Sequence, residues 1–367
     1  MQNFIIPQTV KYIDYYSFAK CNSLTEITIP SSVKKIDEYA FAFCSSLIEI
    51  KASSVEIIGK CAFLECSSLT KVVLSPFLKK INVKTFKSCS SLKEIIITSS
   101  VMLIDEEAFM DCTSLQKITL FNSLKEIGQS VFRNCSSLIN IEIPSSVKSI
   151  GNSAFQKCSS LMHISLQSNL NIINSQVFKY CTSLKEIQLP SSIEFINEEA
   201  FMNCISLERI EIPMKVKIIG DRSFYGCSSL ISVSILSCLE TSVSPIEHID
   251  SDSSSVKLDN CTSSLLTYIG KLAFARCSSL VEIDLPSSVE IIKEEAFAEC
   301  HSLEHIIIPQ KLKRIETNAF INCVSLKDVT IPPSLDYIKE FAFKGCPFLK
   351  KKIPSTVKKS EDNDDFS

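Results

Sequence analysis

One pattern returns every 23 residues along most of this chain, and it limits the possible folds more than any other feature. The segments IPSSVKKIDEYAFAFCSSLIEI (29–50) and IPSSVKSIGNSAFQKCSSLMHI (143–164) share Pro, Ser-Ser-Val, Ile, Ala-Phe, Cys and Ser-Leu at the same spacing. A period in the twenties with this regularity is typical of a solenoid, in which each unit stacks on the next. One Phe marks the register of each unit, at Phe18, Phe41, Phe63, Phe86, Phe109, Phe132, Phe155, Phe178, Phe201, Phe224, Phe274, Phe297, Phe320 and Phe343.

The first part of the unit alternates between apolar and polar residues. In LTEITI, Ile27 and Ile29 point to one side while Glu26 and Thr28 point to the other, which is the period of a β-strand. Pro30 then ends the strand because it has no N–H for a sheet ladder. We expect one strand per unit, paired with the strands of neighbouring units in a parallel sheet with a spacing of about 4.8 Å.

The second part of the unit changes period. In IDEEAFMDC, Asp105 is a candidate N-cap of a very short helical turn that would direct Phe109 and Cys112 inward. Val33 and Ile36 supply the same core from the connecting segment. A lone unit could not bury these side chains, so the units must stack. The fixed letters are therefore the predicted core, and the variable letters the predicted surface.

The repeat resembles the leucine-rich repeat family, specifically the BspA-type repeat of surface antigens from bacteria and some parasitic protists. The segment VFRNCSSLINIEIPSSVKSIG (131–151) carries the likeness, which extends over residues 5–357. The resemblance implies a curved right-handed solenoid of about 14 coils. It places a parallel sheet on the concave face and short helical turns or irregular structure on the convex side. It also implies adhesion or protein recognition.

The repeat register predicts one solenoid domain over residues 1–357, followed by a charged, disordered tail at 358–367. A long step between Phe224 and Phe274 contains an insert, residues 236–263, which is Ser-rich and acidic and lacks the repeat letters. We expect a surface loop that leaves the stack intact, with a binding loop as the alternative.

Cysteines recur at a second fixed position of the repeat. One Cys per unit offers no pairing partner, so we expect buried, reduced thiols rather than disulfides or metal ligands, as in a reducing compartment. Cys61, Cys238 and Cys261 lie off this row, and the last two could bridge the base of the insert under oxidising conditions. Of the 17 cysteines, those in the row are Cys21, Cys44, Cys66, Cys89, Cys112, Cys135, Cys158, Cys181, Cys204, Cys227, Cys277, Cys300, Cys323 and Cys346.

Charge and motifs argue against several function classes. The net charge of −3 does not favour a nucleic-acid partner. Neither a phosphate-binding loop nor a catalytic triad is visible, and His301 and His305 in HSLEH fall on a turn and a strand, so we expect no enzyme, cofactor or metal. Without an 18-residue apolar run or a signal-like start, we expect a cytoplasmic monomer; the resemblance implies the cell surface as the alternative.

The outward positions of the predicted strands remain as a binding surface. Most are polar, but Val73 and Ile96 are apolar in adjacent units, and Phe121 follows where most units have Pro or a small residue. We predict that this concave surface binds a protein or other macromolecule, with ordinary scatter of exposed apolar residues as the alternative. A structural or variable surface antigen without a ligand is the second function considered. The predicted polar rim consists of Lys51, Lys71, Glu94 and Lys117.

Overall fold

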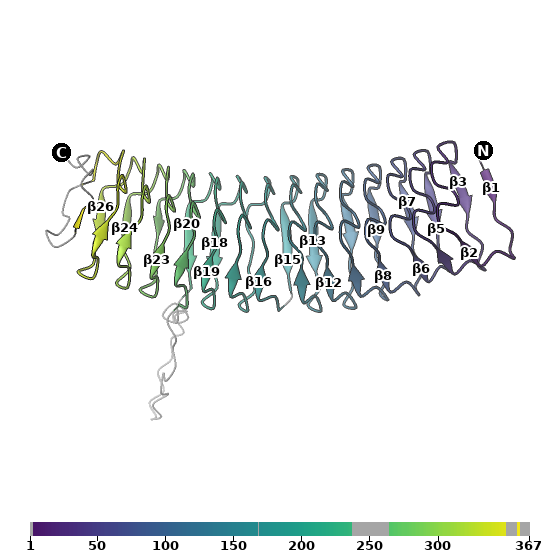
Figure 1. Cartoon of the computed structure of the whole chain (residues 1–367), viewed down its shortest axis with the longest axis horizontal. Helices are drawn as coiled ribbons and strands as arrows, with labels where there is room; N and C mark the ends of the chain where they lie inside the picture. Colours follow the sequence, from purple (N-terminus) through teal and green to yellow (C-terminus); the bar gives the residue numbers. More distant parts are fainter. Residues whose placement is uncertain (1–2, 168, 237–263, 350–357, 360–367) are drawn as a thin grey trace, which may run out of the picture.

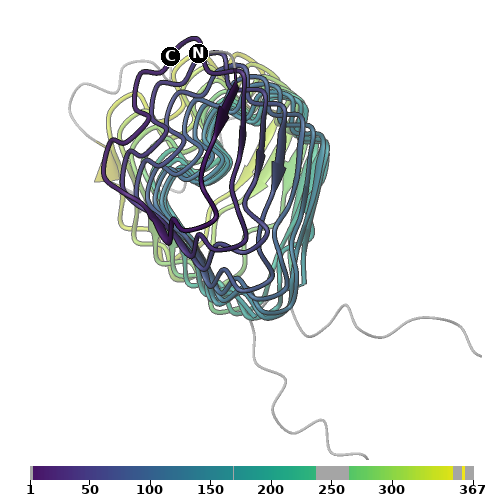
Figure 2. The same cartoon turned by 90° about the vertical axis from the view of Figure 1, so that its right-hand side faces the viewer.

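The chain is a gently bent rod of stacked coils (Figure 1). The computed structural model describes residues 3–167, 169–236, 264–349 and 358–359. It contains about 13 turns of about 23 residues, whose strands pair in parallel. An end-on view shows the coils superimposed around one core (Figure 2). The predicted repeat solenoid is confirmed, while the placement of a sheet on the concave side stays a prediction.

Most coils contribute a first strand that pairs with the first strands of neighbouring coils. Glu26–Thr28, for example, pairs with Glu49–Lys51 through Ile27 and Ile50. The first strands are β1 (Asn3–Ile5), β3 (Glu26–Thr28), β5 (Glu49–Lys51), β7 (Lys71–Val73), β9 (Glu94–Ile96), β11 (Lys117–Thr119), β13 (Asn140–Ile143), β15 (His163–Leu166), β18 (Arg209–Ile212), β20 (Ser232–Ile235), β22 (Glu282–Ile283), β24 (His305–Ile307) and β26 (Asp328–Thr330).

The prediction of a single strand per unit is wrong, because a second, two-residue strand lies in the segment expected to be a connection. Lys35 pairs with Ile57, and Ile36 with Ile58. Two residues are too few for alternation to show in the sequence. The second strands are β2 (Tyr12–Ile13), β4 (Lys35–Ile36), β6 (Ile57–Ile58), β8 (Lys80–Ile81), β10 (Leu103–Ile104), β12 (Glu126–Ile127), β14 (Ser149–Ile150), β16 (Ile172–Ile173), β17 (Phe195–Ile196), β19 (Ile218–Ile219), β21 (Tyr268–Ile269), β23 (Ile291–Ile292), β25 (Arg314–Ile315), β27 (Tyr337–Ile338) and β28 (Lys358–Lys359).

The short helical turn is also wrong, since the described residues form turns and strands without a helix. Glu107 and Asp111 have φ of 54° and 61°, in the left-handed region that ends helical geometry. Their N–H groups donate to the carbonyls of Gln129 and Arg133 in the next coil, each at 2.9 Å. Such bonds between coils offset a conformational cost of roughly 1–2 kcal/mol per left-handed residue. Irregular turns therefore replace the expected helix.

The core is a ladder of phenylalanine rings. The marker Phe residues from Phe41 to Phe320 are fully buried. Successive rings are stacked, with centroids between 5.0 Å (Phe18–Phe41) and 5.8 Å (Phe109–Phe132) apart. The apolar fixed letters of the repeat thus lie inside, as predicted, whereas Ser31 of the fixed Ser-Ser pair is exposed.

The row cysteines from Cys44 to Cys346 form a parallel ladder in which each thiol donates to a backbone carbonyl. The Sγ of Cys135 donates to the carbonyl of Phe109 at 3.2 Å, and the N–H of Cys112 donates to the same oxygen. The described cysteines are free thiols; Cys21 is exposed, Cys346 half-buried, and the row members between them buried. Burial raises the pKa of the Cys227 thiol to about 12. Cys61 is a buried thiol, whereas Cys238 and Cys261 lie outside the described residues.

The stack continues across the insert. Phe224 and Phe274 are stacked at 5.2 Å with an interplanar angle of 2°, although 50 positions separate them in sequence. Residues 237–263 lie outside the described residues, so the predicted loop stays a prediction.

At the predicted boundary between the solenoid and the C-terminal tail, Ile338 pairs with Lys359, so residues 358–359 form a strand where we expected a disordered tail. Residues 360–367 lie outside the described residues.

Deleting residues 237–263 should leave the melting temperature within a few degrees of the full chain. The deletion removes 27 of the 50 positions between Phe224 and Phe274, which restores the 23-residue step of the repeat. Surface loops tolerate such changes because closing a shorter loop costs little free energy. Calorimetry of the two proteins checks this. A fall of ten degrees or more, which for a chain of this size corresponds to roughly 7 kcal/mol, would show that the insert stabilises the stack.

Candidate protein-binding surface

The outer side of the first strands carries the predicted apolar residues. Val73 ends β7, Ile96 ends β9, and Phe121 lies in the turn after β11, where its carbonyl accepts the N–H of Leu124. Ile96 is 62% exposed and Phe121 39% exposed, while Val73 is half-buried. Two of the three predicted residues are thus exposed.

Strand register determines which of these residues are neighbours. Val73 pairs with Lys51 across β5 and β7, and Ile96 pairs with Thr119 across β9 and β11. Phe121 follows Thr119 by two residues, so it lies at the strand end beside the Ile96 pair. Ile96 and Phe121 can therefore contact one partner together.

The charged rim is paired with opposite charges. Glu49 in β5 lies 3.0 Å from the ammonium of Lys71 and 3.4 Å from that of Lys51. The hydrogen bond from Lys71 is the main reason that the pKa of Glu49 lies below its usual value. Glu94 and Lys117 occupy registered positions on β9 and β11. Opposite charges are thus paired on β5 and β7, and Glu49 joins the four rim residues predicted from sequence.

Sequence reasoning missed other exposed apolar residues. Ile307 in β24 is 56% exposed at the repeat position of Ile96. A second set, half-buried except for the exposed Ile291, lies in register on the outer side of five second strands. In the sequence, each member of this set is the apolar residue directly before the core Ile of its coil. This position cannot be recognised as outward-facing until the second strand is known. The set comprises Ile172, Phe195, Ile218, Tyr268 and Ile291.

The first-strand surface carries side chains of the types that can make a reversible protein interface. It combines exposed aliphatic and aromatic groups with hydrogen-bonding charges. Within the described ranges, no three His, Cys, Asp or Glu side chains gather as metal ligands. The same part of the chain contains no helix that is long and apolar enough to span a membrane.

The family model of the BspA type leucine rich repeat region matches the chain in overlapping segments, at residues 1–116, 79–206, 155–245 and 251–364. No curated protein matches the chain.

Solved structures resemble the chain over nearly its whole length. A leucine-rich repeat protein from Bacteroides ovatus is 30% identical, with a TM-score of 0.71 over 98% of this chain and 91% of that one. A leucine rich cell surface protein from Faecalibacterium prausnitzii is 26% identical, with a TM-score of 0.52 over 100% of this chain and 89% of that one. A leucine-rich repeat protein from Eubacterium ventriosum shares the fold at 20% identity and a TM-score of 0.51, over 99% of this chain and 92% of that one.

Proposed function

We propose, because this chain belongs to the BspA-type leucine-rich repeat family, that it is a non-catalytic scaffold that binds a protein partner. The outer side of the first strands around Ile96 is the proposed binding surface. The observation that carries the proposal is the 62% exposure of Ile96 on β9, with Phe121 exposed after β11 and the Glu49–Lys71 ion pair on the preceding first strands. An apolar centre with a polar rim is the usual anatomy of a protein interface.

We also propose that the protein acts at the cell surface. The Faecalibacterium prausnitzii protein that resembles it is a cell surface protein. The thiol row does not argue for a reducing compartment, because burial protects its members between Cys44 and Cys323 from oxidants. Labelling intact source cells with a membrane-impermeant amine reagent tests the location. Labelling of this chain supports the proposal, and labelling only after lysis contradicts it.

Phe121→Ala should weaken binding of the protein partner by about 2 kcal/mol, or about 30-fold in Kd. An aromatic side chain at the centre of an interface contributes more than a rim charge, so Lys117→Ala is the matched control and should change Kd by only a few-fold. The fold should be retained because Phe121 is 39% exposed, outside the core.

The measurement begins with affinity capture by the wild-type protein and continues with titration of the purified partner. Melting curves of both variants establish that they are folded. Equal affinities of wild type and Phe121→Ala would contradict the proposed surface. Failure of the wild-type protein to retain any specific partner would favour the second function, a surface antigen without a ligand.

A further inference from the structure

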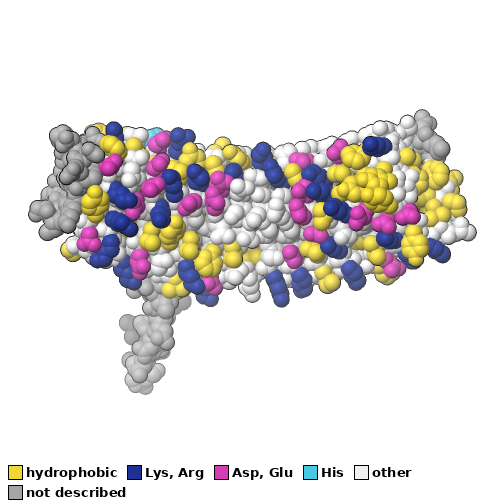
Figure 3. Space-filling model, viewed as in Figure 1, with side chains coloured by type: hydrophobic (Ala, Val, Ile, Leu, Met, Phe, Trp, Pro, Cys, Tyr) yellow, Lys and Arg dark blue, Asp and Glu magenta, His cyan; other side chains and the backbone are white. Residues whose placement is uncertain are grey.

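Three tyrosine rings gather on the turns of the first two coils, away from the first-strand surface. Tyr16 and Tyr39 are stacked, with centroids 4.9 Å apart and an interplanar angle of 7°. Tyr15 stands nearly perpendicular to both, at 89° to Tyr16 and 83° to Tyr39. Tyr15 is 57% and Tyr16 43% exposed. Figure 3 shows a hydrophobic patch over the coils near this end of the molecule. Together the rings form an L-shaped aromatic surface, which we call the tyrosine cluster.

The backbone holds the tyrosine cluster in place. Tyr16 and Tyr39 occupy the same position of successive coils, both with positive φ, and their N–H groups donate to Glu38 and Lys60 of the following coils. The neighbouring Cys61 thiol, which stands off the thiol row, raises the pKa of Tyr39 to about 12.

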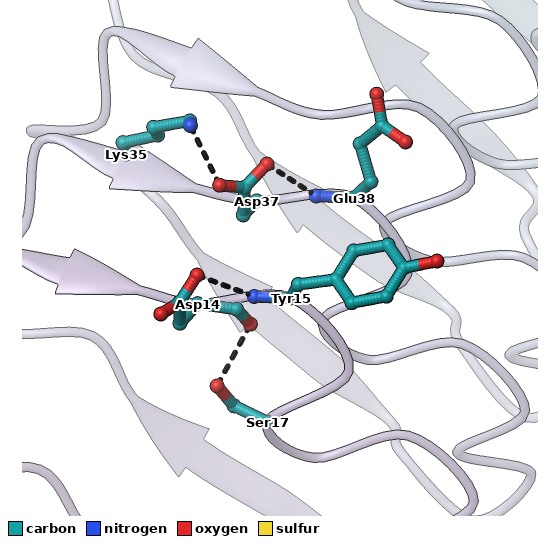
Figure 4. A network of polar contacts seen from close by, with 6 residues as sticks. All are labelled: Asp14, Tyr15, Ser17, Lys35, Asp37 and Glu38. Atoms are coloured by element: carbon teal, nitrogen blue, oxygen red, sulfur yellow. Dashed lines mark hydrogen bonds and ion pairs between the residues drawn. The ribbon is translucent and has the colours of Figure 1, made fainter.

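Carboxylates lie on the same turns as the tyrosines, and Figure 4 shows Asp14, Asp37 and Glu38 around the turn that carries Tyr15. Asp14 accepts the N–H of Tyr15 at 2.9 Å, and Asp37 accepts the N–H of Glu38 at 2.8 Å. Glu38 is exposed and stands at the repeat position of Tyr15 in the next coil, so its side chain extends from the neighbouring turn (Figure 4). Lys35 pairs with Asp37 at 2.6 Å.

One of these carboxylates, Asp37, pairs with Lys35. The sequence around the cluster carries both signs of charge, with Lys20 two residues after Phe18 and Lys60 directly before Cys61. Such a mixture does not favour a polyanion or a basic peptide. A purely apolar ligand would cover the exposed carboxylate of Glu38 without giving it a hydrogen-bond donor, which is costly.

We propose that the tyrosine cluster binds a neutral carbohydrate, namely a β-linked pyranose chain with equatorial hydroxyls. Such a sugar presents a flat face of C–H groups that packs on an aromatic ring. Its hydroxyls can donate to the carboxylates of Asp14 and Glu38 and accept from the tyrosine hydroxyls. The site combines both features in one place, with the rings oriented in advance.

Tyrosine fluorescence of the full chain provides the test. The protein has no Trp, and three of its eight Tyr residues form the cluster, so a bound sugar should change the emission. Cellohexaose and chitohexaose are the probes, and saturation-transfer NMR confirms contact with the sugar. Tyr15→Ala and Tyr16→Ala should each weaken binding about tenfold, as expected for one aromatic contact. The control, Tyr337→Ala, removes a tyrosine at the opposite end of the solenoid and should leave Kd unchanged.

Saturable binding of either hexasaccharide, lost in the cluster variants alone, supports the proposal and shows which sugar is preferred. Melting curves show that the variants are folded, as expected for exposed side chains. Absence of saturable binding by the wild-type chain overturns the proposal. Unchanged affinity of both cluster variants, or salt-sensitive binding of heparin with no binding of the neutral sugars, also overturns it.

Discussion

Phe155→Ala should lower the free energy of unfolding by about 3–5 kcal/mol. Phe155 is fully buried, and its ring lies 5.3 Å from that of Phe132 and 5.8 Å from that of Phe178. The substitution removes a large apolar side chain and leaves a cavity, which the coils on either side cannot close without losing their strand register. Urea unfolding followed by circular dichroism measures the change.

Met162→Ala is the matched control from the same coil, because Met162 is 46% exposed and should change stability by less than about 1 kcal/mol. Each coil contacts mainly its neighbours, so Phe155→Ala is also expected to separate the unfolding transition into two phases. A Phe155→Ala protein as stable as the control would mean that the ring ladder does not hold the coils together.

Thiol reagents should modify Cys21 rapidly in the native protein. They should modify the row from Cys44 to Cys323 at a rate at least about a thousandfold lower. Only the thiolate reacts, and burial both blocks access and raises the pKa, to about 11 for Cys44 and about 12 for Cys227. Modification of the row therefore requires unfolding. Peptide mapping by mass spectrometry after timed labelling measures each site.

The same proteins labelled in guanidinium chloride provide the control, in which the row should react as fast as Cys21. Fast native labelling throughout the row would contradict the packing.

The pH dependence of the stability has a defined sign. Because the folded pKa is raised, the neutral thiols stabilise the fold fully below the ordinary value of 9.0, and this stability is lost as the pH rises towards about 12 for Cys227.

The core was predictable because each core letter occupies the same buried environment in every coil. Phe109 and Cys112 recur at fixed positions since any larger or polar residue there would disrupt two neighbouring coils. The left-handed turns were hard to predict, because residues such as Glu107 carry no signature of positive φ. The position of Asp111 does carry a hint, since other coils place Gly226, Gly345 or an Asn there, and Gly, Asn and Asp adopt positive φ most readily.

The surface was only partly predictable for a related reason. Strand alternation placed Ile96 outside, but the half-burial of Val73 depends on how its neighbours pack. Tyr16 and Tyr39 stand one repeat apart, and their contact follows only once the coils are stacked. The pairing of Lys71 with Glu49 likewise depends on the register of β5 with β7.

Site-specific photo-crosslinking tests the proposed binding surface most directly. Benzoylphenylalanine placed at Ile96, on the first strands, is compared with the same group at Ile291, a 44% exposed apolar position on the second strands. Both proteins are irradiated with the surface proteins of the source cells and their surroundings, and the adducts are identified by mass spectrometry. The account predicts a discrete protein adduct from position 96 and none of comparable yield from position 291. An adduct from position 291 alone, or equal yields from both, would contradict it.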